Sequence, residues 1–147
     1  MPNHYSWLLF DLDNTLLDFS AASKLALIDT CGEYNVPFDE AFYVTYKMEN
    51  AKVWKAFENN EIDTAQLRRI RFKAFFERMD ITNIDPFAFN QDYLKNIINA
   101  SQAYEGVHDV ISALEKNYKL SIITNGLKEV QRARIDKANM TYLIDSI

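Results

Sequence analysis

Two short apolar runs that stop abruptly at polar residues predict two β-strands. Residues 7–10 form a continuous apolar run that ends at Asp11, and residues 120–123 form a second run that ends at Thr124. Continuous rather than alternating apolar residues are typical of strands in a parallel sheet whose two faces are both covered. We therefore expect two buried strands, each followed directly by a polar loop.

Helical periodicity surrounds the second predicted strand. Before it, apolar residues recur at the three- and four-residue spacing of one helix face, at Val107, Val110, Ile111 and Leu114. After it, residues 128–138 contain no helix breaker and are expected to form a helix, although their apolar pattern is less regular. The apolar residues 142–144 resemble the approach to a further strand.

The segment between the two strands predicts several helices. Two apolar stripes have helical spacing, one at Phe42, Tyr46, Val53 and Phe57 and the other at Leu67, Ile70, Ala74 and Phe75. Asp63 followed by Gln66 resembles a capping box, and Asp85–Pro86 precedes a further predicted helix. The arginines at 68, 69 and 71 are expected on a solvated helix face. This order predicts an α/β fold whose parallel-sheet core comprises residues 1–18 and 101–147, with a helical cap at residues 19–100.

Composition narrows the class of protein. The chain has 147 residues, 48% of them hydrophobic, with a net charge of -5. It is too apolar for a disordered chain, and no apolar run approaches the ~18 residues of a membrane span. The acidic balance argues against nucleic acid as a partner, and the single Cys31 fits a reducing, cytoplasmic setting. We expect no membrane and no nucleic-acid partner.

Candidate chemistry lies where the two strands end. Asp11 and Asp13 follow the first strand, at the end of the sheet where α/β folds place ligands. One carboxylate beside Mg²⁺ can attack phosphorus, and the other can carry a proton. The alternative is a surface loop that caps a helix.

The loop after the second strand offers groups that bind anions. A hydroxyl comes from Thr124, an amide from Asn125, and a backbone N–H that can approach an anion closely from Gly126. By itself this trio is also compatible with an ordinary strand-to-helix turn in which Asn125 is the N-cap. Because parallel strands end at the same edge of a sheet, the two loops are expected to converge on one crevice.

These two segments resemble known motifs. Residues 11–16 resemble the first motif of the haloacid dehalogenase-like (HAD) hydrolases and residues 122–126 their second motif. Residues 53–62, 71–72 and 126–135 resemble the pyrimidine 5′-nucleotidase branch of that superfamily. The resemblance implies a Rossmann-like core, magnesium as cofactor and a nucleoside monophosphate as substrate.

The resemblance also implies residue roles. Asp11 would be the nucleophile and a metal ligand, and Asp13 the general acid/base, with its backbone carbonyl on the metal. Thr124 would hold the phosphoryl group, assisted by Asn125 and Gly126. An aspartate at position 13 favours phosphoryl chemistry over haloalkane chemistry, because a halide leaving group needs no proton.

The family also carries a lysine and an acidic motif further along, and this sequence ends at Ile147, before both. We therefore expect the N-terminal part of a longer phosphatase, with the first strand as a bare hydrophobic edge through which copies could associate. Repulsion between Asp11 and Asp13 would go partly uncompensated. The alternatives are another sugar-phosphate phosphatase or phosphoglucomutase, and a catalytically incomplete binding module.

Overall fold

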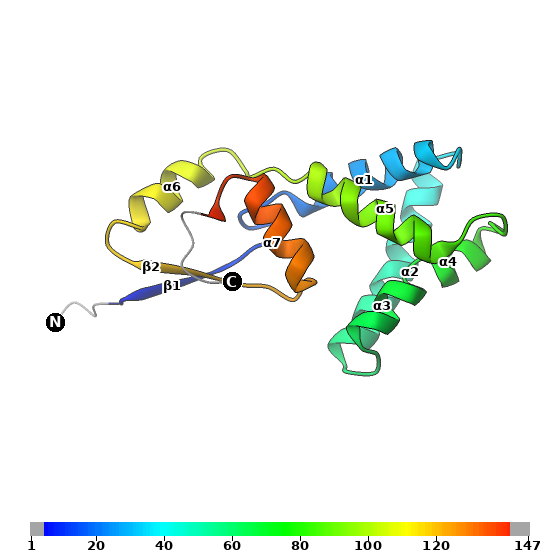
Figure 1. Ribbon diagram of the computed structural model, residues 1–147, viewed down its shortest axis with the longest axis horizontal. Coiled ribbons are helices and arrows are strands. Elements are labelled where there is room, and N and C mark those ends of the chain that lie inside the picture. Colours follow the sequence, from blue (N-terminus) through cyan, green and yellow to red (C-terminus); the bar gives the residue numbers. More distant parts are fainter. Residues whose placement is uncertain (1–4, 142–147) are drawn as a thin grey trace. The chain divides into compact units, whose positions relative to one another are not determined.

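The computed structural model describes residues 5–141, which form helices and a parallel strand pair, an α/β fold (Figure 1). Its elements in chain order are β1 (Trp7–Asp11), α1 (Phe19–Glu33), α2 (Glu40–Glu58), α3 (Thr64–Ile70), α4 (Lys73–Arg78), α5 (Pro86–Asn99), α6 (Val107–Leu114), β2 (Lys119–Ile123) and α7 (Lys128–Lys137). Both predicted strands and the helices before and after the second strand are confirmed. The predicted approach to a further strand at residues 142–144 lies outside the described residues.

The two strands pair in parallel, as predicted. Leu8 lies opposite Leu120 and Phe10 opposite Ile122. Because paired residues point to the same face of a sheet, these four side chains share one face. They pack into a core that includes Ile111 of α6, Ile135 of α7 and residues of the loop after β1. This packing fixes the carboxyl ends of both strands, where the predicted site residues lie.

The other face of the pair is exposed, and the prediction that the first strand is buried on both faces is wrong for the described residues. Leu9 is 61% exposed, Ile123 is 59% exposed, and Trp7 lies on the same face. The reason is that the described part of the chain covers only one face of this pair. Val110, predicted on the inner face of its helix, is likewise exposed.

The predicted apolar stripe of α2 is largely confirmed, since Phe42, Tyr46 and Val53 are buried. The second stripe is divided between α3 and α4, with residues 71 and 72 between the helices. Arg71, expected on a solvated face, is only 4% exposed. Its Nε donates to Asn50 Oδ1, 3.2 Å away, because the break between the two helices turns residues 71 and 72 inward.

The predicted helix starts are also present. Asp63 accepts a hydrogen bond from the Gln66 backbone N–H, and the Gln66 side chain accepts one from the Asp63 backbone N–H, which is a complete capping box. Pro86 is the first residue of α5. Both are positions where local chemistry decides the helix boundary.

By their contacts, the residues divide into two compact units. Among the described residues, one unit comprises 5–23 and 97–141 and contains the sheet, and the other comprises 24–96 and contains α2, α3 and α4. In the second unit, α2 packs against both α3 and α4. Across residues 5–141, no helix combines the length and apolarity needed to cross a membrane.

Candidate active site

The loop after β1 is stabilised mainly by hydrogen bonds within its own backbone. The carbonyl of Leu12, whose side chain is buried, accepts hydrogen bonds from the N–H groups of Thr15, Leu16 and Leu17. Asn14 has a φ of 59°, a left-handed conformation that asparagine tolerates better than most residues. Its Oδ1 accepts from Ser20 at the start of α1. These contacts make the chain curl tightly after the strand, as the sequence predicts.

The two predicted carboxylates have different surroundings. Asp11 is exposed, and its Oδ2 accepts a hydrogen bond from Thr15 Oγ1 at 2.9 Å. Asp13 is half-buried: its Oδ1 lies 2.6 Å from Arg134 Nη1, and its Oδ2 accepts from Gln131 Nε2 at 3.0 Å. The expectation that carboxylate repulsion goes partly uncompensated is therefore corrected, because Arg134 supplies a positive charge directly at Asp13.

The turn after β2 places Thr124 in the same cluster. Thr124 Oγ1 accepts from Gln131 Nε2 at 2.7 Å and from the Gly126 backbone N–H at 3.3 Å. Since Gln131 Nε2 also reaches Asp13, one amide group joins the loops that follow β1 and β2. Asn125 is exposed, and the residue at the N-cap of α7 is Leu127. The structure thus brings Asp13 and Thr124 together.

Sequence reasoning missed Gln131 and Arg134 as members of this cluster. Both lie on α7, and they are 2% and 1% exposed. A signal was available, because positions 131, 134, 135 and 138 follow the spacing of one helix face and the last two carry the buried Ile135 and Ala138. The irregular apolar pattern of this helix arises because two polar residues stand at buried positions.

Magnesium is the cation that these oxygen donors suit. The carboxylate of Asp11 is exposed with one oxygen bonded to Thr15, and Mg²⁺ binds through one or two carboxylates while keeping water and substrate oxygens as its other ligands. Among residues 5–141, no three His, Cys, Asp or Glu side chains gather into a metal cage.

The one cysteine offers no competing nucleophile. Cys31 lies buried in α1, and burial raises the pKa of its thiol to about 12. Because the thiolate is the reactive form, this side chain is inert near neutral pH.

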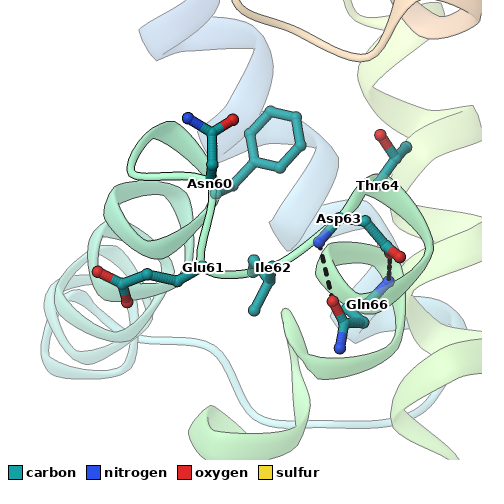
Figure 2. A pocket seen from close by; sticks show the side chains of 7 residues that line it. Asn60, Glu61, Ile62, Asp63, Thr64 and Gln66 are labelled. Carbon is teal, nitrogen blue, oxygen red and sulfur yellow. Dashed lines mark hydrogen bonds between the residues drawn. The ribbon is translucent and has the colours of Figure 1, made fainter.

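An open hollow of about 460 Å³ lies in the unit formed by residues 24–96. Its lining comes from the end of α2, the connection and the start of α3, at Phe57, Asn60, Glu61, Ile62, Asp63, Thr64 and Gln66. Figure 2 shows that the two hydrogen bonds of the capping box form part of this lining. The lining combines the carboxylates of Glu61 and Asp63 with neutral polar and apolar side chains, and the Asp63 carboxylate also caps α3.

The chain is similar to known proteins in both sequence and fold. The family model of the haloacid dehalogenase-like hydrolases matches residues 8–147. The HAD-hydrolase YfnB of Bacillus subtilis is 33% identical over 131 residues, which are 89% of this chain and 55% of YfnB. The crystal structure of YfnB bound to magnesium has a TM-score of 0.88 at 30% identity, covering 98% of this chain and 64% of that one.

Two further relatives carry a named activity. The pyrimidine 5′-nucleotidase PynA of Streptococcus pneumoniae is 33% identical over 97% of this chain and 60% of PynA. The pyrimidine 5′-nucleotidase YjjG of Escherichia coli is 26% identical over 96% of this chain and 60% of YjjG. The chain therefore spans 55% to 60% of the length of these three relatives.

Proposed function

The chain belongs to the haloacid dehalogenase-like hydrolases, and on that premise we propose that it is a magnesium-dependent phosphomonoester hydrolase acting on nucleoside 5′-monophosphates. The observation that carries the proposal is the hydrogen bonding of Thr124. Its Oγ1 accepts from both Gly126 and Gln131, so its two lone pairs are used and its hydrogen is left to donate to an anion. Two relatives named pyrimidine 5′-nucleotidases support the substrate class.

The proposed reaction has two halves. A carboxylate oxygen of Asp11 attacks phosphorus, and the bond from phosphorus to the nucleoside oxygen breaks while Asp13 gives that oxygen a proton. Asp13 then takes a proton from water, and the resulting hydroxide attacks phosphorus and releases Asp11 and inorganic phosphate. Thr124 donates its hydroxyl hydrogen to a phosphoryl oxygen throughout.

Magnesium would be held by the Asp11 carboxylate and the backbone carbonyl of Asp13. When bound, the ion supplies positive charge beside the phosphoryl oxygens and offsets the negative charge of two aspartates. The relative YfnB, whose crystal structure contains magnesium, supports this choice of ion. In the absence of the ion, the chain's own residues still position Asp13 and Thr124 through the Gln131 amide.

The proposal is tested by measuring phosphate release from nucleoside 5′-monophosphates and sugar phosphates, with magnesium and with a chelator. We expect release from pyrimidine nucleotides that the chelator abolishes. Asp11→Asn removes the nucleophile and should lower kcat/KM about a thousandfold or more.

Asp18→Asn is the matched control. Asp18 Oδ1 accepts from the Ala21 backbone N–H at the start of α1, and asparagine caps a helix equally well. This variant should retain the activity of the unmodified chain. A preference for sugar phosphates would assign a different substrate class. If the folded chain releases no phosphate, the proposed hydrolase activity is wrong and the alternative of a binding module remains.

A further inference from the structure

Gln131 and Arg134 are held in one orientation by hydrogen bonds in which Arg134 donates on two sides, to Ser101 and to Gln131. Ser101 Oγ donates to the carbonyl of Ile97 at 2.7 Å, so it must accept from Arg134 Nε, 2.8 Å away. Arg134 Nη1 then donates to Gln131 Oε1 at 2.7 Å. Since this leaves the Gln131 amide hydrogens pointing away from Arg134, they are directed at Asp13 and Thr124.

Each donor uses one lone pair of its acceptor. Arg134 binds Oδ1 of Asp13 and Gln131 binds Oδ2, and a carboxylate has about four lone-pair sites in total. Both oxygens therefore keep a further lone pair that a proton can occupy. The two side chains together fix the plane of the carboxylate.

Stability alone does not account for this arrangement. Arg134 is buried, and its Nη2 has no hydrogen-bond partner within the described part of the chain. A buried polar group left unpaired lowers stability, and well-packed apolar residues often replace a buried ion pair without loss of stability. The contact of the guanidinium with the Phe19 ring, 5.3 Å from its centroid, offsets only part of that cost.

We propose that Gln131 and Arg134 are positioning residues of the active site: they hold the Asp13 carboxylate in the orientation that proton transfer to the leaving oxygen requires. Gln131 also orients the Thr124 hydroxyl that binds the phosphoryl group. The inference rests on the proposed function, because it assigns Asp13 as the proton donor. Gln131 acts through Asp13 and Thr124, and Arg134 acts through Asp13 and Gln131.

The test compares two substrates in each variant. The nitrophenolate released from p-nitrophenyl phosphate is weakly basic and needs little protonation, whereas the alkoxide of a nucleoside 5′-monophosphate needs a proton from Asp13. Gln131→Met and Arg134→Met should therefore raise the ratio of kcat/KM for the nitrophenyl ester to kcat/KM for the nucleotide about tenfold or more. The nucleotide loss should lie in kcat rather than in KM.

The ratio of the two kcat/KM values also distinguishes a positioning role from a folding defect. Both rates come from one preparation, so the unfolded fraction cancels. Arg134→Lys keeps the charge and should raise the ratio less than Arg134→Met does. Ser101→Ala removes only the hydroxyl that accepts from Arg134 Nε and should raise the ratio modestly. Arg132→Lys, an exposed arginine of the same helix, is the control that should leave the ratio unchanged.

Two outcomes overturn the inference, and they are distinguishable. If the unmodified chain hydrolyses both esters and Asp11→Asn abolishes this, but the ratio stays constant in every α7 variant, the positioning role is wrong and the proposed function stands. If the unmodified chain releases phosphate from neither ester, the proposed function and the positioning role both fall.

Discussion

Among single residues, Gly126 is the position where an added side chain would occupy the space of the Gln131 amide. A Cβ added there would lie 2.3 Å from Gln131 Nε2, which is already bonded to Asp13 and Thr124. Gly126→Ala should therefore displace the Gln131 amide and lower the free energy of unfolding by about 1–3 kcal/mol, measured by urea denaturation.

Gly32→Ala is the matched control for that substitution. Gly32 lies in the last turn of α1, and a Cβ there would meet nothing within 4 Å. Because alanine is the better helix former, this variant should gain about 0.5–1 kcal/mol. Equal effects of the two substitutions would contradict the packing of Gln131 against Gly126.

At the level of elements, α3 depends on its capping box. The helix has seven residues, and Asp63 and Gln66 bind each other's backbone N–H groups at its start. Asp63→Ala removes one of these two bonds and should cost about 0.5–2 kcal/mol of stability in a urea titration. Asp63→Asn keeps an acceptor oxygen and should cost almost nothing, so an equal loss in both variants would exclude the cap as the cause.

At the level of the whole molecule, the exposed face of the β1–β2 pair predicts self-association. Leu9 and Ile123 lie on this face, and large exposed apolar surface drives association in water. We expect the average mass measured by light scattering to rise with concentration and Leu9→Thr to reduce the rise. Val110→Thr, a comparably exposed apolar position on α6, is the control, and an equal reduction would assign the association to general hydrophobicity.

Much of the fold could be predicted because it depends on near neighbours in the chain. The apolar runs that end at Asp11 and Thr124, the Asp63 capping box and the start of α5 at Pro86 each involve residues within about four positions of one another. Backbone sterics and local hydrogen bonds decide such features. The position of the two polar loops at the same edge of the sheet depends in addition on the parallel pairing of β1 with β2, which are distant in the sequence.

Both strands, the helices on either side of the second strand and the segments that carry Asp11, Asp13 and Thr124 could thus be predicted from the sequence. It did not separate α3 from α4 or single out α1. Three features instead depend on tertiary packing: Arg134 and Gln131 lie at Asp13, Arg71 is buried, and one face of β1 is exposed. Arg134 and Asp13 are 121 positions apart, and no local pattern determines such a contact. The physical reason is that helix periodicity selects which residues share a face, whereas what that face meets depends on how distant elements pack.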